Sequence, residues 1–312
     1  MLETWKTEDG KLCKIQSPQP GCWIRLISPD GMELTRAAKS AGLDPGVLES
    51  PLDLSEMPGA KVQKEYARIL IDVPILEKEN SPAFQTLPLG IVLSETAIIT
   101  ISARTNQILE HMIQDKTGTI STSKPLGFLN ELLSAAARCY QEDLHHLDAV
   151  RKEVETRAGE QVAKNDLITL HEVETSLIWF GCSLKENVKA LEQFRSQLSS
   201  SRFSSEQDKL EEAEVEMNQA ASMTDMYREI AAAARDLMAD LADNRLNNVM
   251  KFLTSMTLVL AVPTIVSGFY GMNVNEDSIP LAALSHSFLI IVVLTLILTA
   301  ALIVILKKKK ML

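Results

Sequence analysis

The sequence lacks the signatures of a disulfide-rich or catalytic protein. Its four cysteines (Cys13, Cys22, Cys139 and Cys182) form no C-x-x-C pair and have no regular spacing. It contains no glycine-rich phosphate loop and no legible Ser/His/Asp or Cys/His arrangement, and its five histidines show no ligand spacing with cysteines or carboxylates. We therefore expect reduced thiols, no ATP-driven step and no enzymatic activity.

An excess of positive charge is also lacking. The 312 residues include 31 Lys plus Arg against 41 Asp plus Glu, a formal charge of −10. A protein without a basic face cannot displace counterions from phosphates, so we expect no nucleic-acid partner. The chain does not open on a charged, apolar and small-residue cleavage pattern, and we expect no secretory signal. The hydrophobic content of 46% excludes disorder, and the length suggests two domains.

What the sequence does contain is two long apolar runs near its C-terminus. The segments 252–270 and 288–306 each hold nineteen residues without a charge. A bilayer core of about 30 Å needs about 20 helical residues, so both runs predict membrane-spanning helices. Lys307 to Lys310 follow the second run, whereas the connecting loop has Glu276 and Asp277 and no Lys or Arg. By the positive-inside rule we expect a multi-pass protein of the cell membrane with both termini in the cytoplasm.

The first run carries a stripe of small and weakly polar residues. Asn247, Thr254, Ala261 and Gly268 recur every seven positions, and Met250, Thr257 and Thr264 repeat at the same interval. On a helix these positions share one narrow face. Small and hydroxyl residues in a membrane helix are typical either of close helix packing or of a wet pathway, and the spacing by itself favours neither.

The remainder reads as an α/β region followed by long helices. Short runs rich in β-branched residues predict strands at 22–27, 66–73, 87–93 and 97–102, the last two joined by a hairpin at 94–96. Helices are expected at 33–41 and 106–114. Three longer ones are expected from Pro125 to about Arg157, where Gly159 ends the helix, from Asp166 to about Leu198, and from near Ser205 into the first span. The expected domains are 1–124, an α/β domain, 125–250, a bundle and stalk, and 251–312, the transmembrane hairpin with its basic tail.

The third long helix is strongly acidic. The segment from Glu206 to Asp243 contains eleven carboxylates and three basic residues, which gives a local charge of −8. Such a run is either a solvated helix face or a surface that concentrates cations near the membrane. A helix this long needs neighbours, so we expect self-association.

The membrane segment resembles the CorA family of magnesium channels. Its hallmark, Gly-Met-Asn preceded by Tyr, stands at Tyr270-Gly271-Met272-Asn273 between the two spans, with Pro263-Thr264 in mid-span and a basic C-terminus. The resemblance covers the last 70 or so residues closely and the rest by architecture. It implies a funnel-shaped homopentamer in the lipid bilayer, with an α/β cytoplasmic domain, a long helical stalk and two C-terminal transmembrane helices, the first of which lines the pore.

The resemblance also implies roles for individual residues. Gly271, Met272 and Asn273 would form the selectivity filter, with Asn273 binding the ion. A second set would line the pore: Asn247, Met250, Leu253, Thr254, Thr257, Ala261, Thr264 and Gly268. In the family, Mg²⁺ bound between cytoplasmic domains holds the channel closed, and Asp208, Glu211 and Glu212 are the carboxylates expected to sense it here.

The expected function is therefore passive entry of hydrated Mg²⁺, with Co²⁺ or Ni²⁺ as minor permeants and internal Mg²⁺ as the gating ligand. One alternative is a Zn²⁺ transporter of the ZntB type, which shares the fold; histidine or cysteine near the pore would favour zinc, and only His286 lies near. Another alternative is a scaffold tethered to the membrane by its hairpin. A tether requires neither the polar stripe nor Asn273.

Overall fold

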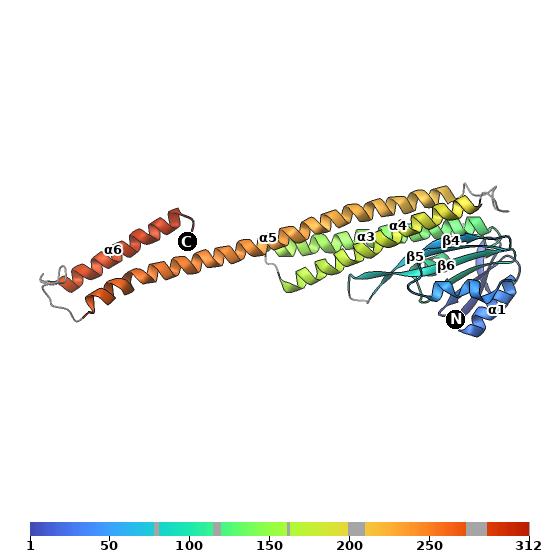
Figure 1. Ribbon diagram of the computed structural model, residues 1–312, viewed down its shortest axis with the longest axis horizontal. Coiled ribbons are helices and arrows are strands. Elements are labelled where there is room, and N and C mark those ends of the chain that lie inside the picture. Colours follow the sequence, from blue (N-terminus) through green and yellow to red (C-terminus); the bar gives the residue numbers. More distant parts are fainter. Residues whose placement is uncertain (78–80, 115–119, 161–162, 199–209, 273–285, 312) are drawn as a thin grey trace. The chain divides into compact units, whose positions relative to one another are not determined.

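The computed structural model describes residues 1–77, 81–114, 120–160, 163–198, 210–272 and 286–311. The chain divides into two compact units, Met1–Asp236 and Leu237–Leu312, and helix α5 contributes to both. The predicted fold class is confirmed: an α/β region, long helices and two C-terminal apolar helices are all present (Figure 1).

The first unit is built on a seven-stranded mixed sheet. In chain order its strands are β1 Leu2–Glu8, β2 Lys11–Ile15, β3 Cys22–Ile27, β4 Gly59–Val62, β5 Tyr66–Leu76, β6 Phe84–Ser94 and β7 Ala97–Ser102. They lie in the order β2-β1-β3-β7-β6-β5-β4, and only β3 and β7 pair in parallel. The hairpin expected at 94–96 is confirmed between β6 and β7. Strands β1, β2 and β4 were not predicted from the sequence.

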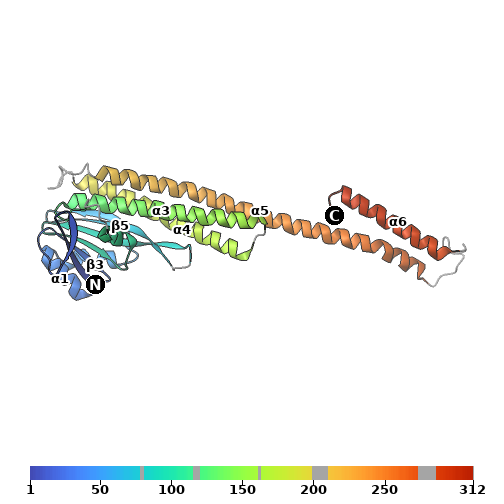
Figure 2. The same ribbon diagram turned by 180° about the vertical axis from the view of Figure 1, so that it is seen from behind.

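Helices cover both faces of this sheet. One face carries α1 (Gly31–Ala41) and two 3₁₀ turns, Pro45–Leu48 and Ser50–Leu52; the other carries α2 (Gln107–Gln114), α3 (Pro125–Glu160) and α4 (Lys164–Leu198) (Figures 1 and 2). Neighbouring side chains of a strand point to opposite faces, and β3 follows this rule. Trp23 enters the core under α3, whereas Cys22 and Ile24 enter the core under α1.

Polar side chains fix the long helices to the sheet. The amide of Asn187 on α4 accepts a hydrogen bond from the backbone N–H of Asp72 and donates one to its carbonyl, both at 2.8 Å. Farther along α4, Gln193 and Gln197 accept hydrogen bonds from Ala60 and Val62 of the edge strand β4. These contacts satisfy backbone donors that an edge strand otherwise leaves open.

Helix α3 ends later than expected. Helix α3 continues through Gly159 to Glu160, because a glycine inside a helix costs only about 1 kcal/mol relative to alanine. Helix α5 begins at Glu211, and the earlier start expected near Ser205 lies outside the described residues.

Gly90 of β6 is required by a close approach to Pro51, since an added Cβ would lie 2.3 Å from Pro51 Cγ.

The second unit consists of the C-terminal part of α5 (Glu211–Tyr270) and α6 (Ser287–Lys308). In both views α6 runs beside this part of α5 (Figures 1 and 2). Among the described residues, these are the two helices that are long and apolar enough to cross a membrane.

Candidate functional site

One face of α5 in the second unit is turned toward α6. Ser255 is fully buried, and its hydroxyl donates a hydrogen bond of 2.9 Å to the carbonyl oxygen of Met311, just after α6. The partly buried residues that follow continue this face at helical spacing: Val259, Val262, Val266 and Tyr270. Ser255 was not predicted from the sequence, because its partner is a backbone group 56 residues away.

The predicted pore-lining residues lie on the opposite face of α5. At 3.6 residues per turn, their mean direction is about 200° from that of the Ser255 face. The set consists of Asn247, Met250, Leu253, Thr254, Thr257, Ala261, Thr264 and Gly268. Ala261 is half-buried in this chain, and the other seven residues are exposed. The stripe is therefore not the surface on which α5 packs against α6 of the same copy.

Two of the threonine hydroxyl groups of this stripe are satisfied within the helix. Thr257 donates to the carbonyl oxygen of Leu253, and Thr264 donates to that of Leu260, each at 2.9 Å. A threonine that uses its proton in this way keeps oxygen lone pairs for water or for a hydrated cation. Thr257 and Thr264 thus present acceptors while their own donors are paired, as a membrane surrounding requires.

The predicted filter begins where α5 ends. The N–H groups of Gly271 and Met272 donate to the carbonyl oxygens of Ser267 and Phe269, at 2.9 and 3.4 Å, and both residues are exposed. A Cβ at Gly271 would lie 3.1 Å from the Ser267 oxygen, so the small residue suits this helix end. Asn273, the residue expected to bind the ion, lies outside the described residues, as do Glu276 and Asp277.

The predicted sensor carboxylates stand at the other end of α5. Glu211 and Glu212 are exposed in its first turn, where the helix dipole favours negative charge, and Asp208 lies outside the described residues. In the described part of the chain, neither glutamate forms an ion pair, and no three His, Cys, Asp or Glu side chains lie close enough to hold a metal ion. A single copy therefore does not assemble a metal site here from the residues described.

Other acidic residues of α5 are neutralised by neighbouring helices, which the sequence analysis did not foresee. Glu214 pairs with Arg195 at 2.9 Å, and Asp225 pairs with Lys185 at 3.2 Å, both cations lying on α4. Glu216 lies 3.9 Å from Arg138 of α3. The local charge of −8 counted along the sequence overstates the repulsion, because it omits cations contributed by α3 and α4.

Comparison with known proteins agrees with this arrangement. The family described as CorA-like Mg²⁺ transporter protein matches residues 19–308, nearly the whole chain. The chain belongs to this family. It is therefore a membrane protein from a family of transporters rather than of enzymes.

Relatives show the same resemblance in sequence and in structure. The cobalt/magnesium transport protein CorA of Methanocaldococcus jannaschii is 26% identical over 264 residues, which are 83% of this chain and 81% of that protein. The complete structure of the CorA magnesium transporter from the same organism matches with a TM-score of 0.82 at 22% identity, covering 98% of this chain and 96% of that one. The ZntB cytoplasmic domain of Vibrio parahaemolyticus matches with a TM-score of 0.63 at 12% identity, over 78% of this chain and 98% of that domain. The structural matches show a shared fold.

Proposed function

We propose that this chain forms a passive channel through which hydrated Mg²⁺ enters the cytoplasm, with Co²⁺ or Ni²⁺ as minor permeants. The observation that carries the proposal is the small and hydroxyl stripe of α5, which lies on the face opposite Ser255 and α6. Family membership and the cobalt/magnesium transport of the archaeal relative support the choice of ion.

The chemistry of the stripe suits a hydrated ion. Mg²⁺ gives up its octahedral water shell reluctantly, so a pathway that contacts the ion through its waters avoids the cost of dehydration. Thr257 and Thr264 supply acceptor oxygens, and Gly268 leaves room for water. Moving a divalent ion inward through a potential of 100 mV releases about 4.6 kcal/mol, so no nucleotide is needed.

A single α5 helix cannot enclose such a pathway, and we propose that five copies do so around the stripe. The lysines at 307–310 favour both termini being cytoplasmic. Asn273 would then lie at the outer mouth, as one amide from each copy. Met250 and Leu253 would form an apolar ring at the inner end, which can close by dewetting.

We further propose that Mg²⁺ at Asp208, Glu211 and Glu212 favours the closed state. Glu211 and Glu212 are free of ion pairs in the described part of one copy, so their charge is available to an ion shared between copies. A ligand shifts an equilibrium toward the state that it binds better, so loss of internal Mg²⁺ would favour opening.

Ion flux into liposomes tests the pathway. Purified protein is reconstituted, and Mg²⁺ uptake is followed with an internal indicator under an inside-negative potential, with Zn²⁺ added as a competitor in a parallel series. We expect Asn273→Ala to abolish uptake while the assembly stays intact by size-exclusion chromatography, and Asn218→Ala, on the exposed surface of α5, to leave uptake unchanged. Near-normal uptake by an intact Asn273→Ala assembly would sink the filter assignment, and uptake of Zn²⁺ in preference to Mg²⁺ would favour the zinc alternative.

The sensor is tested by inhibition. Uptake is measured against internal Mg²⁺ for the wild type and for a variant carrying Asp208→Asn, Glu211→Gln and Glu212→Gln. We expect the variant to conduct but to lose inhibition at high internal Mg²⁺. The control removes three negative charges nearer the C-terminal end of α5, with Glu229→Gln, Asp240→Asn and Asp243→Asn. Coincident inhibition curves for the wild type and the sensor variant would place the sensor elsewhere.

A further inference from the structure

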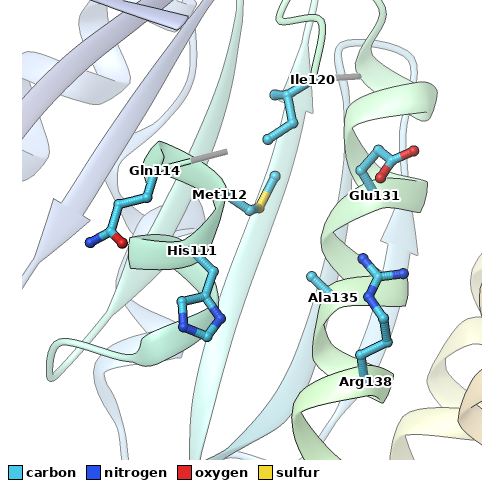
Figure 3. A pocket seen from close by; sticks show the side chains of 7 residues that line it. All are labelled: His111, Met112, Gln114, Ile120, Glu131, Ala135 and Arg138. Atoms are coloured by element: carbon cyan, nitrogen blue, oxygen red, sulfur yellow. The ribbon is translucent and has the colours of Figure 1, made fainter. Parts of the chain in front are cut away.

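A hollow of about 420 Å³ lies between α2 and α3 in the first unit (Figure 3). Its floor is apolar: Met112 and Ile120 are buried members of the core, and Ala135 is half-buried on α3. A cavity with an apolar floor and a few polar groups at its rim is the usual form of a small-molecule site.

Two side chains that can donate hydrogen bonds stand on opposite walls of this hollow. Figure 3 shows His111 on the α2 side and Arg138 on the α3 side, with Ala135 one turn from Arg138. Each can donate to a carboxylate or a phosphate: Arg138 through its guanidinium group, and His111 through a ring N–H.

The guanidinium group of Arg138 is not anchored by hydrogen bonds to carboxylates, as those of three other arginines in this unit are. Arg25, Arg151 and Arg235 each donate hydrogen bonds to two carboxylates. Within the described residues Arg138 donates none; its carboxylate neighbour, Glu216, lies at 3.9 Å, and the side chain is 53% exposed. A guanidinium that is held beside an apolar floor without a close acceptor is suited to an anionic ligand.

We propose that this hollow binds a small organic anion with a flat apolar body. The body would lie on Met112, Ile120 and Ala135, and its carboxylate or phosphate would sit between Arg138 and His111. Glu131 lies on the rim nearer the start of α3 than Arg138, and it would accept a hydrogen bond from a polar group at the other end of the ligand. The site shares no residue with the predicted pore or with the predicted Mg²⁺ sensor.

Occupancy would be communicated first to α5. The Glu216 oxygen that faces Arg138 is buried and accepts no hydrogen bond in the described part of the chain. An anion that draws the guanidinium into the hollow would weaken its attraction for Glu216, on the same helix that carries the pore stripe. The ligand would thereby bias how α5 packs on α3.

Binding to the full-length protein in detergent, followed by isothermal titration calorimetry at fixed Mg²⁺, tests the proposal. The probes are adenosine 5′-monophosphate and indole-3-acetate, an aromatic phosphate and an aromatic carboxylate. Adenosine, inorganic phosphate and acetate, each lacking either the anion or the aromatic body, are the comparison compounds. We expect at least one of the two probes to bind with a Kd below about 1 mM, and each comparison compound to bind at least about tenfold more weakly.

Two variants locate the binding. Arg138→Gln removes the cation and Ala135→Phe fills the floor with the charge intact; each should weaken the probe at least about tenfold. Arg36→Gln, which removes an exposed arginine of α1, should leave the Kd unchanged. The proposal is overturned if neither probe binds at millimolar concentration, or if both hollow variants bind like the wild type. Because the readout is binding, the result is independent of whether the chain conducts Mg²⁺.

Discussion

The two units of this chain treat large apolar side chains in opposite ways. In Met1–Asp236, Trp23, Phe128 and Tyr140 are completely buried between sheet and helices. In Leu237–Leu312, side chains such as Leu296 and Phe288 are mostly exposed along helices that have no such core. The first unit thus has a buried apolar core of its own, whereas the second exposes its apolar side chains, as helices that cross a membrane do.

Polar groups show a difference of degree. The first unit adds ion pairs between elements, as between Arg235 on α5 and Glu174 on α4 at 3.0 Å, to hydroxyl bonds within its helices such as that of Thr175. In the second unit Thr295 and Thr299 of α6 donate within their helix, and Ser255 donates to the carbonyl oxygen of Met311. A lipid surrounding allows no unpaired backbone or hydroxyl donor, and local pairing meets that condition before any partner is present.

A charge placed on each unit gives the largest expected difference. Leu296→Asp, in the middle of α6 at a residue 64% exposed, should oppose membrane insertion by about 2.5 to 3.5 kcal/mol. Met32→Asp on α1, at a residue 80% exposed, should change stability by less than about 0.5 kcal/mol. The amount of each variant recovered from the membrane fraction, relative to wild type, measures the effect. Equal recovery of the two variants would contradict the assignment of α6 to lipid.

A smaller effect is expected from overpacking the core of the first unit. Gly90→Ala places a Cβ against Pro51, and such strain typically costs about 1 to 3 kcal/mol. Its control is Gly159→Ala, where an added Cβ meets no atom within 4 Å and the helix should gain up to about 1 kcal/mol. Thermal unfolding should show a lower Tm for the first variant and a Tm equal to or above wild type for the second. A Tm for Gly90→Ala at or above wild type would show that β6 and the Ser50–Leu52 turn are not packed closely.

The smallest effect concerns a buried carboxyl of α3. Burial raises the pKa of Asp143 to about 7, and the charge of Glu142 acts in the same direction. The folded state therefore favours the neutral acid, so the contribution of Asp143 to stability is fully present below the ordinary pKa of 3.8 and is lost as the pH rises through about 7.

The neutral amide removes that dependence. Asp143→Asn should raise the Tm at pH 8 relative to wild type and flatten the change in Tm between pH 8 and pH 5. Glu56→Gln, an exposed carboxyl of the same unit, should behave like wild type. Parallel pH profiles for Asp143→Asn and wild type would show that the Asp143 side chain is solvated in the folded state.

The sequence predicted the second unit better than the first for a physical reason. A nineteen-residue apolar run and its lysine flank are local signals, and the helices lie where those signals place them. Strands β1, β2 and β4 carry polar residues, and β2 and β4 are also short; their stability comes from pairing with other strands, which local periodicity does not report. The cations that face α5, such as Arg195 and Lys185, come from another helix and were likewise invisible to a count along one segment.

The candidate site divides in the same way. The seven-residue stripe could be predicted, because it follows from helical geometry alone. The side of α5 that faces α6 could not, because the contact of Ser255 with Met311 depends on how the chain returns after the second span. The unused donors of Arg138 also depend on tertiary contacts, since a sequence does not show which carboxylates come close.

The most direct test of whether the stripe of α5 lines the ion pathway is the accessibility of the two faces of α5 to a water-soluble reagent. In a background in which Cys13, Cys22, Cys139 and Cys182 are replaced by alanine or serine, single cysteines are placed at Thr264 on the stripe and at Val266 on the Ser255 face. Each reconstituted protein is then exposed to a charged, membrane-impermeant methanethiosulfonate while Mg²⁺ flux is recorded. We predict that Thr264→Cys is labelled and that its flux is blocked, while Val266→Cys is neither labelled nor blocked. Labelling and block at Val266→Cys with none at Thr264→Cys would show that the water-filled pathway runs along the other face of the helix.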